Sequence, residues 1–284
     1  MTEPRKALVL GAAGGLGRAF VERLRGRCET VALGHLELDV TRRNDVFDAV
    51  REHKADLVID AAGVSDVDLC ETDRWQAYLT NRDGAKHLAM AVAQVGGLLV
   101  YVSSDLVFDG SKQTPYREED PPNPLSIYGD TKLAAELAVM SHAPSHLVVR
   151  TGWLFGPFGR NYVTDLLAWR ATQELVLGFD DQRSQPTYQH DFVDAVLELV
   201  KRDRTGLWHV ASEGDATQYE VAQAAYEMLK VEGVDVKPLR RGQGGHTALR
   251  PRYSVLDCSK LYGAGIQVRP WKAGLRAYLA SVPR

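Results

Sequence analysis

Short apolar runs alternate with longer segments of mixed polarity through the first half of the chain. The apolar runs lie at residues 6–10, 30–33, 56–60 and 98–102 and have the length of strands buried on both faces of a sheet. The segments between them space their apolar residues as amphipathic helices do. Strand and helix therefore alternate, which predicts βα units.

This alternation predicts an α/β fold, a doubly wound parallel sheet of the Rossmann type. We expect residues 1–150 to form most of this domain, with returning segments from later in the chain. Residues 151–284 should form mainly a smaller C-terminal lobe, with helices near 190–201 and 219–229 and a strand near 207–211. The polar segment 64–75 is expected to be a loop.

A glycine-rich turn, Gly11-Ala12-Ala13-Gly14-Gly15-Leu16-Gly17, follows the first strand and opens a helix over about 18–25. Gly11 permits the tight turn, Gly14 lets backbone amides approach a pyrophosphate, and Gly17 lets helix and strand pack closely. The diphosphate would lie at the helix N-terminus, where free N–H groups and the helix dipole favour anions. We predict a dinucleotide site here that includes Gly15 and Leu16. The alternative is a flexible turn without a ligand.

The end of the second strand bears on the choice between NAD(H) and NADP(H). The strand ends at Gly34-His35, where NAD-selective sites often place an acidic residue to hold the ribose hydroxyls, although Glu37 and Asp39 follow closely. Arg18 could meet a 2′-phosphate, or it is only a solvated helix residue. The sequence therefore favours NADP(H), with NAD(H) possible.

Two further segments are expected to contact the cofactor. Asp39 and Val40 are predicted to form a turn beside the adenine, although Asp39 could equally be a plain turn or capping residue. Ala61, Ala62 and Gly63 follow the third strand, and small residues there let a cofactor lie against the backbone. Residues 1–150 are then an NAD(P)-binding domain.

A tyrosine and a lysine are placed to act together after a proline-rich run. Ser126 can cap a helix over about 127–141, on which Tyr128 and Lys132 lie one turn apart on the same face. We expect the ammonium to lower the pKa of the phenol from about 10, so that Tyr128 protonates a carbonyl oxygen near neutral pH. The alternative is a surface tyrosine and lysine on an amphipathic helix.

Ser104 follows the fourth strand, at the edge of the sheet where the cofactor is expected. With no cysteine beside it, we expect its hydroxyl to orient a carbonyl together with Tyr128 rather than to act as a nucleophile. The alternative is a serine in the turn at the strand end.

Composition restricts the partners and the location. A net charge of −3 gives no reason to expect nucleic acid or an anionic membrane as partner, and no apolar run is long enough to cross a membrane. The cysteines Cys28, Cys70 and Cys258 are odd in number and lack the spacing of metal ligands. They indicate reduced thiols in a cytoplasmic protein without a catalytic metal.

Several motifs occur in a fixed order along the chain. They are Gly11-x-x-Gly14-x-x-Gly17, Ser103-Ser104-Asp105 with Val107-Phe108-Asp109-Gly110, Tyr128-Gly-x-Thr-Lys132, Arg150-Thr151-Gly152-Trp153, and Asp181-Gln182-Arg183-Ser184-Gln185-Pro186-Thr187. Together they resemble the extended short-chain dehydrogenase/reductases and, within them, the dTDP-4-dehydrorhamnose reductase branch. The resemblance covers nearly the whole chain.

The resemblance implies roles for individual residues. Ser104, Tyr128 and Lys132 would form the family's catalytic triad, with Lys132 also holding the nicotinamide ribose. Trp153 would lie against the sugar, and Asp105 is a further candidate for substrate binding. Asn161 could cap a helix or bind the substrate.

A basic, glycine-rich loop near the C-terminus supplies the last candidate. Arg250-Pro251 with Ser254 resembles the family's Arg-Pro-x-x-Ser substrate loop, so Arg250 is expected to contact the substrate. Arg240, Arg241, His246 and Arg252 belong to the same loop, which could close on a nucleotide diphosphate. The alternative is a solvated basic loop.

The implied activity is NAD(P)H-dependent reduction of a 4-keto-6-deoxy nucleotide sugar by a monomer or homodimer. The alternatives are reduction of another ketosugar or a small natural-product carbonyl, or a non-catalytic NADP-binding subunit like that of methionine adenosyltransferase. A sugar-nucleotide dehydratase is disfavoured because Leu106, not an acid, follows Asp105. Leu106, Asp60, Gly63 and Ser184 depart from the branch's usual residues, which bears on the identity of the substrate.

Overall fold

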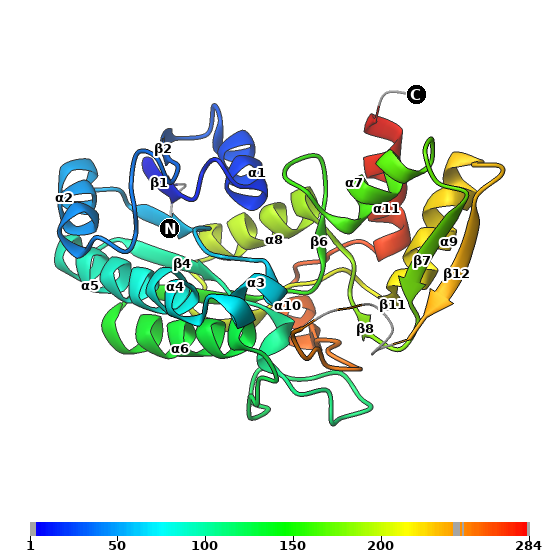
Figure 1. The fold of residues 1–284 in the computed structure, drawn as a ribbon. Coiled ribbons are helices and arrows are strands. Elements are labelled where there is room, and N and C mark those ends of the chain that lie inside the picture. Colours follow the sequence, from blue (N-terminus) through cyan, green and yellow to red (C-terminus); the bar gives the residue numbers. More distant parts are fainter. Residues whose placement is uncertain (1–3, 241–244, 246, 283–284) are drawn as a thin grey trace.

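The computed structural model describes residues 4–240, 245 and 247–282, which contain a six-stranded parallel sheet (Figure 1). Its strands are β1 (Lys6–Leu10), β2 (Glu29–Leu33), β3 (Leu57–Asp60), β4 (Leu98–Val102), β5 (His146–Arg150) and β10 (Gly206–His209). They lie in the order β10-β5-β4-β3-β1-β2, and each neighbouring pair is parallel. The predicted doubly wound α/β fold is confirmed.

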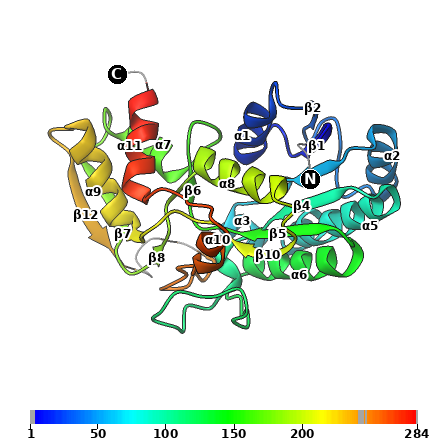
Figure 2. The same ribbon diagram turned by 180° about the vertical axis from the view of Figure 1, so that it is seen from behind.

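Helices cover both faces of the sheet. They are α1 (Gly15–Leu24), α2 (Arg43–His53), α5 (Ala85–Val95), α6 (Ile127–His142) and α8 (Gln189–Lys201). Helices α2, α5 and α6 lie on one face and α1 and α8 on the other, as Figures 1 and 2 show. Strands β3 and β4 are therefore buried on both sides, which explains why their sequences are continuous apolar runs.

The strand order reverses at β1, which has β2 on one side and β3 on the other. At such a reversal the connections leave the sheet in opposite directions, and a crevice opens at the carboxyl ends of the strands. The residues that follow β1, β3, β4 and β5 all reach this edge, so the topology brings the predicted site residues together.

The chain between β3 and α5 is helical rather than irregular. It forms α3 (Val67–Thr72), α4 (Arg74–Ala77) and a π-helical turn over Tyr78–Gly84. Residues 64–66 are irregular as predicted, but the loop predicted over the rest of 64–75 is wrong. The carboxylate of Asp66 caps α3 by accepting the N–H groups of Asp68 and Leu69, both at 3.0 Å. A helix this short shows no apolar periodicity, so the pattern did not reveal it.

The second half of the chain builds a lobe beside the sheet. Its elements are β6 (Leu154–Phe155), α7 (Tyr162–Trp169), β7 (Leu175–Phe179), β8 (Arg183–Ser184), β9 (Thr187–Tyr188), β11 (Ala216–Thr217), α9 (Gln218–Leu229), β12 (Asp235–Leu239) and α11 (Trp271–Ser281). Helices α7, α9 and α11 share an apolar core of their own with β7. The helices predicted near 190–201 and 219–229 are α8 and α9. Helix α8 and β10, however, return to the large sheet.

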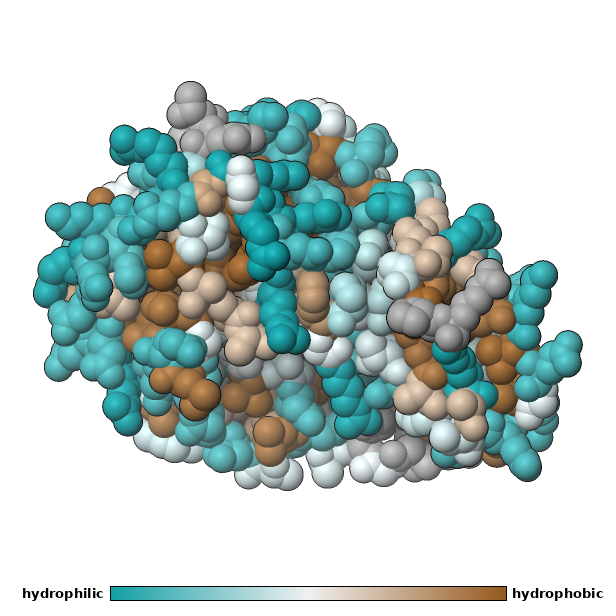
Figure 3. Space-filling view, turned by 90° about the horizontal axis from the view of Figure 1, so that it is seen from above, coloured by the Kyte–Doolittle hydropathy of each residue, from teal (hydrophilic) through white to brown (hydrophobic). Residues whose placement is uncertain are grey.

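Seen from above, hydrophilic residues cover most of the periphery of the molecule, with hydrophobic residues grouped between them (Figure 3). No helix among the described residues is long and apolar enough to cross a membrane.

A buried ion pair fixes α6 to the sheet. Arg150, the last residue of β5, donates from Nε to Oε1 of Glu136 at 2.8 Å and from Nη2 to Oε2 at 2.6 Å. The two side chains are 3% and 0% exposed. A buried charge is stable only when it is paired, so this bidentate contact sets the position of α6 over β5. The same helix carries Tyr128 and Lys132.

Replacing Glu136 by glutamine should lower the free energy of unfolding by about 3–5 kcal/mol, because the Arg150 guanidinium is then buried without a counter-charge. Urea unfolding followed by circular dichroism measures this change. The matched control is Asp48→Asn, which removes an exposed pair with Arg51 and should cost less than about 1 kcal/mol. A loss for Glu136→Gln no larger than that of the control would contradict the role given to the pair.

Candidate active site

A cavity of about 610 Å³ opens at the carboxyl edge of the sheet. Its walls combine segments that are far apart in the sequence. They are Gly14, Gly15 and Leu16 after β1, residues 60–65 after β3, residues 103–106 after β4, Tyr128 and Lys132 on α6, residues 151–154 after β5, residues 158–161, and Gln189, with Val67, Asn81 and Val102. The cavity therefore lies where the strand order predicts a ligand.

The glycine turn is shaped by close backbone approaches. Gly11 has φ +68°, and a Cβ on it would lie 2.5 Å from the carbonyl oxygen of Ala61. A Cβ on Gly17 would lie 2.2 Å from the carbonyl oxygen of Gly11. The tight turn at Gly11 and the close helix–strand packing at Gly17 are thus confirmed. Gly14 is the N-cap of α1, and no side chain caps this helix end. Because Gly14, Gly15 and Leu16 line the cavity, the N-terminus of α1 faces it and can receive an anion.

A loop of the second lobe closes over this turn, which the sequence did not reveal. The side-chain amide of Gln189 donates to the carbonyl oxygen of Phe158 at 3.0 Å, and its oxygen accepts the N–H of Phe158 at 3.4 Å. A Cβ on Gly15 would lie 2.6 Å from the carbonyl oxygen of Phe158. Gly15 therefore permits this contact, and Phe158 and Gln189 join the predicted cofactor residues at the cavity.

The residues predicted to contact the adenosine half lie outside the cavity lining. The carboxylate of Asp39 accepts the N–H and the hydroxyl of Thr41 at 3.0 and 2.8 Å. Partial burial opposes the effect of these bonds, but the pKa of Asp39 is lowered overall. Val40 is buried against Gly84, and the guanidinium of exposed Arg18 lies 6.0 Å from the ring centre of Phe158. The cofactor contacts of Asp39, Val40 and Arg18 remain predictions.

The structure places an acidic side chain, Glu37, at the end of β2, where the sequence shows no acid directly after the strand. The chain turns back after Gly34, and the carboxylate of Glu37 accepts the N–H of Gly34 at 2.9 Å. An acid at the end of this strand is the feature that holds ribose hydroxyls in NAD-binding sites. Sequence spacing alone did not show that Glu37 returns to this position.

Ser104 and Tyr128 meet in the cavity. The Ser104 hydroxyl donates to Oδ1 of Asp105 at 3.1 Å and accepts the N–H of Leu106 at 3.1 Å, and the side chains of Ser104 and Tyr128 both line the cavity. Tyr128 lies in the first turn of α6 because the Ser126 hydroxyl caps the helix by accepting the N–H of Gly129 at 3.2 Å. The predicted cap is thus confirmed.

The predicted effect of Lys132 on Tyr128 is wrong in this structure. Burial raises the pKa of Tyr128 above its usual value, and Asp105 and Cys70 add to the rise, while the hydrogen bond from Ser104 opposes it. Desolvation therefore outweighs any attraction to the lysine. The ammonium of Lys132 lies instead over the ring of Tyr101, 4.3 Å from its centre.

Lys132 and Asp60 are buried groups of opposite charge that both line the cavity, and each affects the pKa of the other. Burial lowers the pKa of Lys132 to about 8, and the carboxylates of Asp60 and Glu136 oppose this shift. Burial also raises the pKa of Asp60 to about 6, against the attraction of Lys132 and a hydrogen bond from the N–H of Ala62. Both shifts have the direction expected for charges removed from water.

Asp105 links three segments instead of presenting a free carboxylate. It is 2% exposed, and its Oδ2 accepts the hydroxyls of Ser184, at 2.6 Å, and Ser254. Its Oδ1 accepts the hydroxyl of Ser104. Burial raises the pKa of Asp105, although the three hydroxyls favour its charged form. The geometry thus makes Asp105 an anchor between the sheet and the second lobe, while its predicted contact with substrate is untested.

The other predicted substrate residues are placed as follows. Trp153 is half-buried and lines the cavity. Asn161 also lines it, but its side-chain oxygen caps α7 by accepting the N–H of Thr164 at 3.1 Å, and its amide donates to the carbonyl oxygens of Gly156 and Gly159. Of the two predicted roles for Asn161, the structure shows the helix cap.

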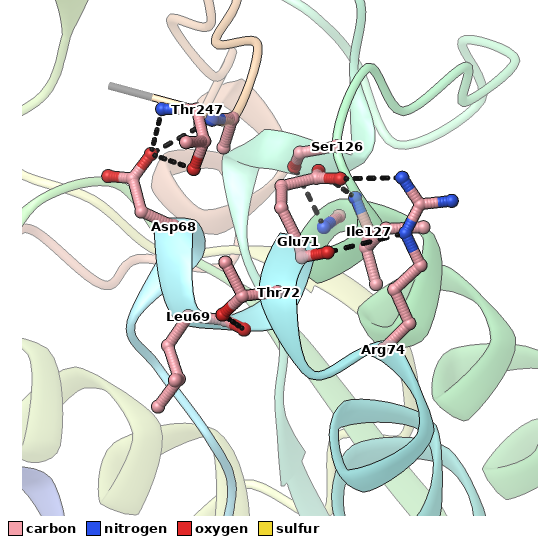
Figure 4. A network of polar contacts seen from close by, with 10 residues as sticks. Asp68, Leu69, Glu71, Thr72, Arg74, Ser126, Ile127 and Thr247 are labelled. Carbon is pink, nitrogen blue, oxygen red and sulfur yellow. Dashed lines mark hydrogen bonds and ion pairs between the residues drawn. The ribbon is translucent and has the colours of Figure 1, made fainter. Parts of the chain in front are cut away.

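Arg250 does not belong to the described cavity lining. Its guanidinium forms an ion pair with Asp68 of α3 at 2.6 Å. Oδ1 of Asp68 also accepts the N–H groups of Thr247 and Ala248 at 2.9 Å, and Figure 4 shows the contact with Thr247. The substrate contact of Arg250 remains a prediction. Within the same basic loop, residues 241–244 and 246, including Arg241 and His246, lie outside the described residues.

Helix α3 is also tied to α6, which carries Tyr128 and Lys132. Oε1 of Glu71 accepts the N–H of Ile127, the first residue of α6, at 2.8 Å, and its other oxygen pairs with Arg74 at 3.3 Å (Figure 4). A carboxylate at a helix N-terminus is favourable because it satisfies a free N–H and faces the positive end of the dipole. The wall formed by residues 64–67 is thus held between α6 and the C-terminal loop.

No group of three or more His, Cys, Asp or Glu side chains in the described part of the chain could hold a metal ion. Cys28, Cys70 and Cys258 are all free thiols.

Asp105→Asn should lower the free energy of unfolding by about 1–3 kcal/mol, because an amide offers one acceptor oxygen in place of two and cannot accept from all three buried hydroxyls in their present positions. Urea unfolding monitored by tryptophan fluorescence tests this. The double variant Ser184→Ala/Ser254→Ala should also be less stable than the wild type, because it leaves Oδ2 of the buried Asp105 carboxylate without these two donors. If Asp105→Asn is as stable as the wild type, Asp105 does not anchor the two parts.

Comparison with known proteins gives consistent matches over the whole chain. Residues 5–283 match the family model described as RmlD substrate binding domain. The chain is 37% identical over 276 residues to a dTDP-4-dehydrorhamnose reductase of Streptomyces griseus, covering 94% of this chain and 91% of the relative. It is 38% identical over 274 residues to a probable dTDP-4,6-dihydroxy-2-methyloxan-3-one 4-ketoreductase of Streptomyces antibioticus, covering 95% and 92%.

Among solved structures, the chain is similar to the dTDP-4-dehydrorhamnose reductase of Bacillus anthracis in complex with NADP. The TM-score is 0.95 at 31% identity, and the match covers 99% of this chain and 100% of that one. A dTDP-4-dehydrorhamnose reductase from Clostridium acetobutylicum matches with a TM-score of 0.94 at 34% identity, covering 97% and 98%.

Proposed function

The chain belongs to the family described as the RmlD substrate binding domain, and we propose that it is an NAD(P)H-dependent reductase of a 4-keto-6-deoxy nucleotide sugar. The simplest substrate is dTDP-4-dehydro-L-rhamnose, which would give dTDP-L-rhamnose. Relatives that cover most of the chain are named for reductases of dTDP-linked ketosugars.

One observation carries the proposal. The cavity brings Ser104, Tyr128 and Lys132 to the same edge of the sheet as the N-terminus of α1. A helix N-terminus receives the diphosphate of a dinucleotide, and a hydroxyl pair receives a carbonyl oxygen. The two functions lie in one cavity, which is what reduction of a ketone by a bound dinucleotide requires.

The chain's own groups account for the proton. When bound, the nicotinamide supplies the hydride that goes to the ketone carbon. Because burial raises its pKa, Tyr128 is protonated at neutral pH and holds the proton that goes to the ketone oxygen. Hydride and proton together convert the C=O group to CH–OH. The Ser104 hydroxyl would orient the ketone, and the Ser104 side chain lowers the pKa of Tyr128, which favours the charged form as the proton leaves.

The residues after Ser104 disfavour elimination of water. A dehydratase needs an additional acid at this position, but Leu106 follows Asp105, and both oxygens of Asp105 accept serine hydroxyls. Reduction without elimination is the better match. Reduction of a related dTDP-linked ketosugar is the second candidate, because the ketoreductase of Streptomyces antibioticus matches as closely as the rhamnose-type enzymes.

NADP(H) is the favoured cofactor and NAD(H) a possible one. A related reductase was solved with NADP, and a more distant neighbour with NAD. Glu37 would act in the opposite direction and favour NAD(H). Its carboxylate lies at the end of β2, where it would accept ribose hydroxyls and repel a 2′-phosphate.

We also propose which part of the chain binds each ligand and where in the cell the enzyme acts. Residues 1–150 with the returning α8 and β10 would bind the cofactor, and the rest of residues 151–284 would bind the sugar nucleotide. The enzyme would act in the cytoplasm as a monomer or homodimer, without a nucleic-acid or membrane partner. The alternative is a non-catalytic NADP-binding subunit. Turnover of a ketone substrate by the protein would exclude this alternative.

Tyr128→Phe should lower kcat for NADPH-dependent reduction of dTDP-4-dehydro-L-rhamnose by about 10²–10⁴-fold, because the ring then carries no proton to transfer. Single-turnover oxidation of NADPH, followed by absorbance, measures it. Tyr219→Phe is the matched control, since that hydroxyl contacts Gln223 in the second lobe and should leave the rate unchanged. Absence of wild-type turnover despite NADPH binding would refute this substrate.

Glu37→Gln should raise the preference for NADPH over NADH, with kcat/KM for NADPH increasing about 5–30-fold, since removal of a charge near the 2′-phosphate is worth roughly 1–2 kcal/mol. Initial rates with each cofactor give the ratio. Glu52→Gln, on the far end of α2, serves as the control. An unchanged ratio would show that Glu37 does not face the ribose.

A further inference from the structure

The proposed reaction leaves one carboxylate at the cavity without a role. Asp60 is the last residue of β3, is 4% exposed and lines the cavity. One of its oxygens accepts the N–H of Ala62 at 3.1 Å. An ionised carboxylate so poorly hydrated needs a compensating positive charge.

The register of the sheet places that charge beside it. Asp60 pairs with Tyr101 of the neighbouring parallel strand, so their side chains point to the same face of the sheet. The ammonium of Lys132, which reaches this face from α6, lies 4.3 Å from the centre of the Tyr101 ring. Asp60 and Lys132 are thus neighbours of one ring, and both line the cavity.

The other titratable groups around Lys132 do not supply a free negative charge. Glu136, one turn further along α6, forms the bidentate pair with Arg150. Burial raises the pKa of Cys70 on α3 to about 11, and it raises the pKa values of Tyr101 and Tyr128 as well, so all three groups are neutral at pH 7. Among the described groups that face the lysine, Asp60 is the carboxylate that no arginine balances.

We propose that Asp60 is a positioning residue of this enzyme, whose carboxylate keeps Lys132 in its ammonium form and directed to the cavity. Lys132 can hold the ribose of the cofactor as a charged donor only while it is protonated. Asp60 therefore acts through Lys132 and does not touch the reacting atoms. The inference deepens the proposed reductase function and rests on it for its catalytic consequence, but not for its effect on cofactor binding.

The charges define a pH window. Burial raises the pKa of Asp60 to about 6 and lowers that of Lys132 to about 8, and each group opposes the shift of the other. Between these values both are ionised. Above about 8 the lysine loses its proton, and below about 6 the carboxylate gains one. Removing the carboxylate removes an effect that raises the lysine pKa, so deprotonation must begin at lower pH.

The test is the pH dependence of NADPH binding in the wild type and in Asp60→Asn, measured by NADPH fluorescence between about pH 5.5 and 9.5. The amide oxygen of the variant can still accept the N–H of Ala62. In the wild type, affinity should fall above about pH 8. In Asp60→Asn the alkaline fall should move down by about one pH unit. The alkaline limb of kcat/KM for the ketosugar should move with it.

Two further variants separate charge from structure. Asp60→Glu restores the carboxylate and should keep the alkaline limb close to that of the wild type. Asp48→Asn makes the same chemical change on the exposed face of α2 and should leave the profile unchanged. Superimposable profiles for the wild type and Asp60→Asn would overturn the proposal. So would an Asp60→Glu limb as low as that of Asp60→Asn, since shape and not charge would then be responsible.

The two readouts distinguish this inference from the proposed function. A shifted NADPH-binding profile without turnover of the nucleotide sugar would support the role of Asp60 and refute the proposed substrate. Turnover of the nucleotide sugar with an unshifted NADPH-binding profile would support the proposed substrate and refute the role of Asp60.

Discussion

The close approach of β1 and β3 at their carboxyl ends is the constraint on which the site depends. Gly11 lies so near the backbone of Ala61, and Gly17 so near Gly11, that neither position has room for a Cβ. This packing brings the N-terminus of α1 and the end of β3 to one edge of the sheet. A side chain at either glycine would push the helix away from the strand, and with it the free N–H groups that can receive a diphosphate.

Burial has the largest effect on the pKa values of the ionisable groups at this edge of the sheet. Tyr128, Lys132 and Asp60 all have pKa values shifted toward their neutral forms, because desolvation exceeds the attractions between them. A tyrosine with a raised pKa retains its proton at neutral pH, and a lysine with a lowered one needs a nearby carboxylate to remain charged. The same burial thus keeps Tyr128 protonated and makes the charge of Lys132 harder to maintain.

A small number of polar anchors hold the second lobe and the C-terminal loop to the sheet and its helices. Asp105 binds the hydroxyls of Ser184 and Ser254, which come from two different parts of the second half of the chain. Asp68 of α3 holds the C-terminal loop, and Glu71 of the same helix holds the start of α6. Each anchor is a carboxylate whose acceptors are filled by protein donors, so the walls of the cavity are fixed before any ligand binds.

The sequence by itself determined the features that depend on near neighbours along the chain. Alternating apolar runs predicted the sheet, the spacing of glycines predicted the turn before α1, Ser126 predicted the start of α6, and Tyr128 and Lys132 share a face because they are four residues apart. Only the tertiary structure decided which distant groups meet. It paired Arg250 with Asp68, used both oxygens of Asp105, closed Phe158 over Gly15, and returned Glu37 to Gly34. It also raised the pKa of Tyr128, opposite to the prediction from spacing, because desolvation depends on the surrounding chain and not on the distance between two residues in the sequence.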